Sequence, residues 1–130
     1  MLKGVLIKAG VLGAIGVLGG AFGAHALKEV LTAEQLLSFQ TGVRYQMIHA
    51  VVLMVLFLLL NKYDLKPFKI AAQLIFWGVV LFSGSIYLLT LKNIIGLEVL
   101  KFAGPITPLG GTLIIIGWVF IVLGALKLKE

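Results

Sequence analysis

Long apolar runs constrain this chain more than any other feature of its sequence. Residues 9–27 contain only one polar side chain, His25, and further apolar runs cover residues 47–60, 70–91 and 109–126. About 20 apolar residues in a helix cross about 30 Å of hydrocarbon. Three of the runs meet this length, and the 14 residues of the second run fall short of it.

The residues before the second run extend it. Thr32-Ala33-Glu34-Gln35 has the form of a capping box, and no proline follows until Pro67, so we expect one helix from about residue 33 to residue 61. The sequence therefore predicts a single membrane domain, residues 1–130, with spans at about 9–27, 44–61, 70–91 and 109–126. Residues 28–43 and 92–107 are expected at the outer membrane surface, where the second segment either forms an interfacial helix or dips inward.

Composition supports a membrane protein. Hydrophobic residues make up 61% of the chain and charged residues 12%, whereas soluble domains are about half apolar and a quarter charged. The net charge of +6 comes from single basic residues between apolar runs, a pattern that suits membrane-surface anchors and argues against nucleic acid. The chain has no cysteine, which excludes disulfides and thiolate metal sites.

Basic residues in the connections predict the direction of the spans. Seven lysines fall on the side of the membrane that would carry both termini, against four basic residues on the other side. Because positive charge favours the cytoplasmic side, we expect both termini in the cytoplasm. The predicted fold class is an all-α membrane protein, an antiparallel four-helix transmembrane bundle.

Glycine follows a heptad spacing in two spans. Ala9 is followed by Gly13, Gly16, Gly20 and Gly23 in the first span, and the fourth span carries Gly110, Gly117 and Gly124. Small residues let helix backbones approach closely in lipid, and this spacing is that of a left-handed seam. We predict a packing seam on each of these spans, against either a helix of the same chain or a second copy.

Polar side chains gather in the predicted outer halves of the spans. The candidate cluster consists of His25, Tyr45, Gln46, His49, Ser83, Tyr87 and Thr90. Since polar groups that face hydrocarbon are costly, these should face one another or water, with His25 and His49 at similar depth. Arg44 lies about 140° from His49 on a helical wheel and is a candidate contact for a lipid phosphate.

Two interpretations of this cluster stay open: a set of interhelical hydrogen bonds, or a binding pocket. Metal is not expected, because zinc sites use three or four protein ligands and the cluster offers two histidines. The spans contain no carboxylate, so the usual proton relay of a pump and an acid–base pair are both missing. We therefore predict no catalytic residues, no cofactor and no enzyme activity.

Four sequence blocks carry a family resemblance: "GAFGAHAL", "FQTGVRYQMIHA", "FSGSIYLLTL" and "GPITPLGGTLIIIGW". Together and in this order they resemble domain-of-unknown-function family 423, the family of YgdD-like and transmembrane protein 256-like small membrane proteins. The resemblance implies four spans in a bacterial plasma membrane, and it implies no activity, cofactor or site residue.

Two functions follow from these observations. The first is a non-enzymatic structural or accessory membrane component, as a homo-oligomer or part of a larger membrane complex and surrounded by lipid. The alternative is a binding or transport protein whose outer-leaflet polar pocket holds a lipid, a quinone or a small solute.

Overall fold

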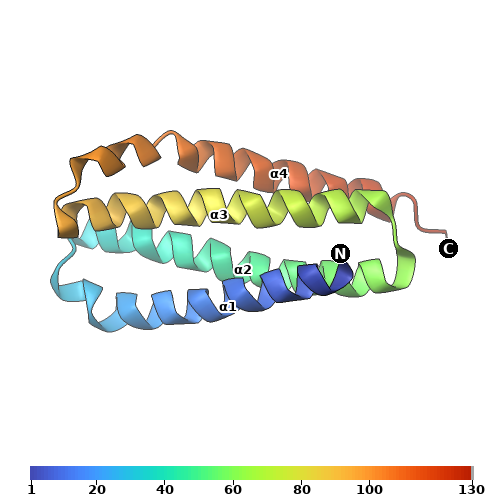
Figure 1. Cartoon of the computed structure of the whole chain (residues 1–130), viewed down its shortest axis with the longest axis horizontal. Helices are drawn as coiled ribbons and strands as arrows, with labels where there is room; N and C mark the ends of the chain where they lie inside the picture. Colours follow the sequence, from blue (N-terminus) through green and yellow to red (C-terminus); the bar gives the residue numbers. More distant parts are fainter. Residues whose placement is uncertain (130) are drawn as a thin grey trace.

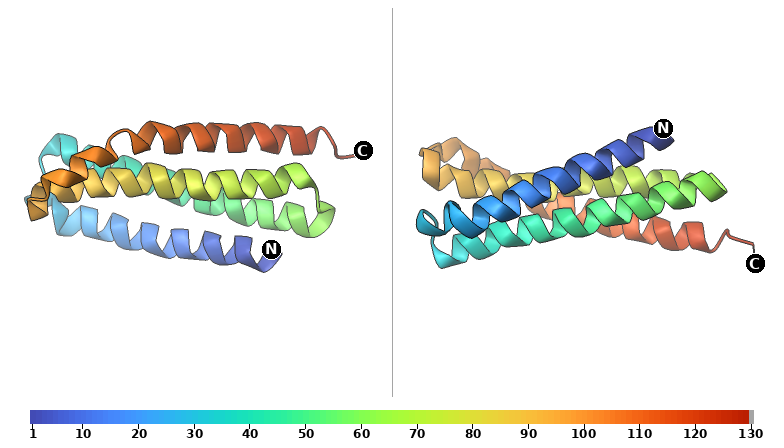
Figure 2. Two further views of the ribbon diagram at one scale, coloured as in Figure 1. Left: turned by 45° about the horizontal axis from the view of Figure 1, so that its top comes forward. Right: turned by 90° about the horizontal axis from the view of Figure 1, so that it is seen from below.

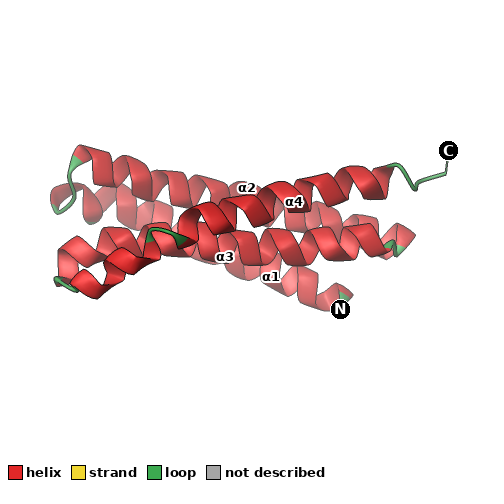
Figure 3. Ribbon diagram, turned by 90° about the horizontal axis from the view of Figure 1, so that it is seen from above, coloured by secondary structure: helices red, strands yellow, loops and turns green. Residues whose placement is uncertain are grey.

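The computed structural model describes residues 1–129, which form four long helices joined by short connections. The helices are α1 (Leu2–His25), α2 (Ala33–Tyr63), α3 (Lys66–Ile95) and α4 (Ile106–Ala125), with 3₁₀ turns η1 (Leu27–Glu29) and η2 (Glu98–Ala103) between them. Within the described residues there is no strand (Figure 3). The predicted all-helical, four-span fold is confirmed.

Consecutive helices run antiparallel, and both termini lie at the same end of the bundle as the α2–α3 connection (Figure 1). We call this the termini end, and the end that carries η1 and η2 the two-loop end. The central helices α2 and α3 pack on each other, while α1 packs mainly on α2 and α4 mainly on α3. The two flanking helices therefore lie on different sides of the central pair (Figure 2).

Local sequence signals set the helix ends. The predicted capping box is present at the start of α2: the Thr32 hydroxyl accepts a hydrogen bond from the Gln35 amide, and the Gln35 side chain accepts one from the Thr32 amide. Helix α3 stops at Gly96, whose φ of 69° is a left-handed conformation that favours glycine. The helix therefore includes residues 92–95 of the segment expected at the outer surface.

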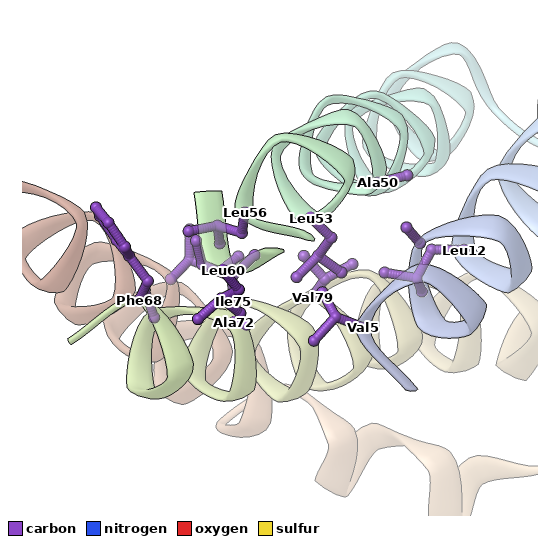
Figure 4. Close-up of a cluster of buried hydrophobic side chains, with 13 residues drawn as sticks. Val5, Leu12, Ala50, Leu53, Leu56, Leu60, Phe68, Ala72, Ile75 and Val79 are labelled. Carbon is purple, nitrogen blue, oxygen red and sulfur yellow. The ribbon is translucent and has the colours of Figure 1, made fainter. Parts of the chain in front are cut away.

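The apolar core lies in the half of the bundle toward the termini end. Val5, Leu53, Leu56, Ile75 and Val79 are almost fully buried there and point toward one another (Figure 4). Outside this core the helices expose many large apolar side chains, as expected for a surface that faces lipid. All four helices are long and apolar enough to cross a membrane.

Candidate functional site

Gln46 joins three helices near the middle of the bundle. Its side chain is 3% exposed. The Nε2 group donates to the Leu12 carbonyl of α1 at 2.8 Å, and Oε1 accepts from the Tyr87 hydroxyl of α3 at 2.7 Å. Because both ends of the amide have partners inside the bundle, this buried polar group stabilises the packing instead of opposing it.

His49 joins α2 to α4. Its ring is 4% exposed, with Nδ1 2.7 Å from the Tyr45 carbonyl and Nε2 3.1 Å from Nε1 of Trp118. An indole N–H can only donate, so Nε2 must be the unprotonated acceptor and Nδ1 must carry the hydrogen that Tyr45 accepts. The hydrogen bonds therefore specify one neutral tautomer, in which neither nitrogen is available for a metal or for proton transfer.

Other polar contacts join α3 to α2 and to α4. The Ser83 hydroxyl donates to the Gly42 carbonyl at 2.6 Å, between α3 and α2. Ser85 and Thr107 share a hydrogen bond of 2.6 Å where α4 begins. In the part of the chain that the structure describes, no buried side-chain nitrogen or oxygen atom lacks a hydrogen-bond partner.

The structure brings together five of the seven residues of the candidate cluster. Gln46 and Tyr87 are hydrogen-bonded, Tyr45 stacks on His49 with ring centroids 6.0 Å apart, and Ser83 bonds to the α2 backbone beside them. The sequence signal for this grouping was the gathering of polar side chains in one half of the spans, which also included His25 and Thr90. Whether they bind a ligand stays a prediction.

His25 lies apart from this cluster, and the expectation that it shares the depth of His49 is wrong. Gly13 faces Ala50 and Gly23 faces Phe39, so His25 is level with about residue 38 of α2. At 1.5 Å per residue the two histidines differ in depth by about 16 Å. The reason is that α2 pairs with α1 from its first turns, which puts His49 near the middle of the bundle; His25 itself is exposed.

Thr90 belongs to a separate cleft at the two-loop end. This cleft has a volume of about 420 Å³. Its polar lining residues are Glu34, Gln35, Ser38, Thr41, Thr90 and Thr107. Ile86 and Leu89 of α3 complete the lining, so side chains from α2, α3 and the first turn of α4 surround a space that is partly polar, partly apolar and open at the surface.

Arg44 is exposed and lies on the other side of α2, in agreement with its position on the helical wheel. Together with Gln40 it borders a groove of about 260 Å³ between α1 and α2, where Gly19, Gly20 and Gly23 leave space. A contact between Arg44 and a lipid phosphate stays a prediction.

The glycines of the two heptad patterns face helices of the same chain. A Cβ atom on Gly16 would lie 2.5 Å from Sδ of Met47 on α2, and one on Gly117 would lie 2.6 Å from Cγ1 of Ile75 on α3. A Cβ on Gly110 would meet the α3 backbone itself, at Phe82. Close approach between α3 and α4 therefore requires glycine at this position.

Sequence reasoning missed two polar partners. Trp118 was counted as part of an apolar run, although its indole N–H bonds to His49. Lys8 was counted as a flanking charge, but its ammonium donates to Oε1 of Gln73 at 2.8 Å and lies 4.6 Å from the centre of the Phe76 ring. One sequence feature could have indicated the Lys8–Gln73 contact: Gln73 is a polar residue in the otherwise apolar half of its span toward the termini end.

The polar side chains of this site hold the helices together by hydrogen bonds within the chain. Among residues 1–129, no group of three histidine or carboxylate side chains is placed to hold a metal ion. The fold and the polar network together define the class: a small integral membrane protein, a bundle of four antiparallel helices locked by interhelical hydrogen bonds and glycine contacts.

Comparison with known proteins gives the family. Residues 19–111 match the family model described as "Protein of unknown function (DUF423)", and the chain belongs to this family. No solved structure gives a significant match.

Several relatives cover nearly the whole chain. It is 41% identical to the UPF0382 membrane protein YwdK of Bacillus subtilis (strain 168), over 95% of this chain and 97% of that protein. It is 34% identical to the UPF0382 inner membrane protein YgdD of Escherichia coli (strain K12), over 97% of this chain and 92% of that protein. These names and the four apolar helices identify a multi-pass protein of the bacterial inner membrane.

Proposed function

We propose that this protein is a non-enzymatic accessory component of the membrane, which acts through its lipid-embedded surface and not through a reaction centre. The observation that carries this proposal is the saturated polar core: the Gln46 amide bonds to α1 and α3, and the His49 ring nitrogens bond to the Tyr45 carbonyl of α2 itself and to Trp118 of α4. A catalytic or transporting site needs groups that are free to engage a substrate.

The distribution of charge supports the same proposal. Acid–base chemistry would need a carboxylate near the buried polar groups, and the described carboxylates are all exposed and lie outside the bundle core: Glu29, Glu34, Asp64 and Glu98. Transport would need a polar path to the termini end, where Leu53 and Ile75 are fully buried in the apolar core.

A partner would bind to the outer faces of the flanking helices. The heptad glycines are engaged within the chain, so a second copy or another membrane protein would meet apolar side chains such as Ile15 on α1 and Ile115 on α4, which are 51% and 66% exposed.

Photo-crosslinking in native membranes tests this proposal. A photoreactive amino acid at residue 15 or 115 is expected to give a defined higher-mass protein product, while the same group at the buried Val79 should give crosslinks only within the chain. If both outer faces yield only lipid adducts, and the protein purified in mild detergent is a monomer with nothing bound, the accessory role is refuted.

The cleft at the two-loop end favours a second candidate, the binding of a small polar solute or a lipid headgroup. The Glu34 carboxylate and the Ser38 and Thr90 hydroxyls could hydrogen-bond such a ligand, whereas Gln35, Thr41 and Thr107 already bond within the chain. Native mass spectrometry of protein released from its own membranes should show a bound small molecule that a Ser38→Ala/Thr90→Val variant loses. Thr112→Val, outside the cleft, is the control, and the same bound species in all three proteins would refute this binding site.

A further inference from the structure

A second groove lies between α3 and α4 at the termini end, away from the polar network. It has a volume of about 450 Å³. One wall of the groove is apolar. It consists of Ile70 of α3, Phe120 and Leu123 of α4, and Leu126 directly after α4. Lys66, Pro67 and Lys127 complete the lining at the end of the groove that faces away from the bundle centre.

Helix length places these two lysines at the membrane surface. The 20 residues of α4 span about 30 Å, the thickness of the hydrocarbon layer, so Lys127 lies just beyond that layer. Gly124 faces Phe68 across the α3–α4 contact, which puts Lys66 at the same level on the neighbouring helix. The apolar wall lies below them, at the depth of the acyl chains.

The charge at this position is positive. Lys66 and Lys127 are both exposed, and the neighbouring carboxylate of Asp64 is bound by Lys69 at 2.7 Å. The positive end of the α3 helix dipole lies here, but so does the negative end of the α4 dipole, since α3 begins at Lys66 and α4 ends at Ala125. The two lysines therefore supply the positive charge. Lysines at the surface of a membrane attract anionic headgroups.

We propose that this groove binds one anionic phospholipid, with its phosphate between Lys66 and Lys127 and an acyl chain along Ile70, Phe120 and Leu123. The two parts of the groove together select this occupant. A free phosphate would use only the lysines, and a zwitterionic lipid would gain little from two ammonium groups. This binding is separate from the function proposed above and does not depend on it.

Native mass spectrometry in nanodiscs tests the proposal. Phosphatidylglycerol and phosphatidylcholine with identical acyl chains are compared on the wild type, a Lys66→Gln/Lys127→Gln variant and a Lys92→Gln/Lys101→Gln variant. The last removes the same charge from the two-loop end. We expect retention of phosphatidylglycerol over phosphatidylcholine by the wild type and the control variant, and about 30-fold weaker retention by Lys66→Gln/Lys127→Gln.

Two further measurements separate the alternatives. Glycerol 3-phosphate, added as a free headgroup, is expected not to bind, and circular dichroism should show unchanged helix content in both variants. The proposal is overturned if both double variants lose phosphatidylglycerol equally, if phosphatidylcholine is retained as well as phosphatidylglycerol, or if glycerol 3-phosphate binds with the same dependence on Lys66 and Lys127.

Discussion

Gly110→Ala tests whether direct backbone contact holds α4 against α3. A Cβ at this position would lie 2.8 Å from both the Gly78 carbonyl oxygen and the Phe82 Cα, and closer still to the Phe82 amide nitrogen. Ordinary contacts begin near 3.4 Å. All three atoms are backbone, so no side-chain rotation can relieve the clash, and the helices must separate locally by at least about 0.6 Å.

The magnitude follows from two opposing effects. Overpacking of a tight contact costs about 1–3 kcal/mol, and the upper end applies here because a gap of this size also forfeits a quarter or more of the dispersion attraction along the seam. Alanine recovers about 1 kcal/mol of helix propensity relative to glycine. The expected net loss is about 2 kcal/mol, or roughly a 30-fold shift toward the unfolded state.

Gly84→Ala is the matched control, because a Cβ there would meet nothing within 4 Å. It lies in the interior of α3 and should be neutral or slightly stabilising. The free energy of unfolding is measured by titration with sodium dodecyl sulfate in mixed micelles, followed by tryptophan fluorescence. Equal stability of Gly110→Ala and Gly84→Ala would show that the α3–α4 contact is looser than the structure indicates, and would refute the reasoning.

Three further predictions concern single interactions and use the same unfolding assay. Trp118→Phe should lower the free energy of unfolding by about 1 kcal/mol, because it removes the donor to Nε2 of His49. Trp77→Phe is the control and should cost less, since this indole is exposed and has no hydrogen bond in the described part of the chain. Equal losses in the two variants would contradict the role of the hydrogen bond. Gln73→Leu should destabilise more than the Lys8→Met/Gln73→Leu double variant, because the single change leaves the ammonium without its acceptor; simple additivity in the double-mutant cycle would argue against this coupling. Thr32→Ala should cost about 1 kcal/mol by opening the capping box of α2, and an unchanged unfolding free energy would mean that this end of the helix is frayed.

The sequence was informative about local features. Apolar length predicted the spans, and the residues Thr32 and Gln35 predicted where α2 begins, because the physical signal for each lies within a few residues along the chain. The helical spacing of Gln46 and His49 also identified the buried face of α2, since that spacing is a property of one helix, whereas Tyr45 beside them is 41% exposed.

Contacts between helices were predicted less well. The prediction that His25 and His49 lie at the same depth was wrong. Their relative depth depends on which turn of α2 packs against which turn of α1, and this register is not determined by any single residue. Trp118 and Lys8 were missed for a related reason: the identity of a hydrogen-bond partner depends on how two distant helices are rotated about their axes.

By itself, then, the sequence determined that this chain crosses the membrane four times, and that two of its helices carry flat glycine faces. Only the tertiary structure decided that those faces meet helices of the same chain, that His49 is a neutral acceptor for Trp118, and that Lys66 and Lys127 come together over an apolar groove. The physical reason is one of range. Hydrophobic length and helical periodicity act within a segment, whereas register and helix rotation are fixed by the packing of all four helices together.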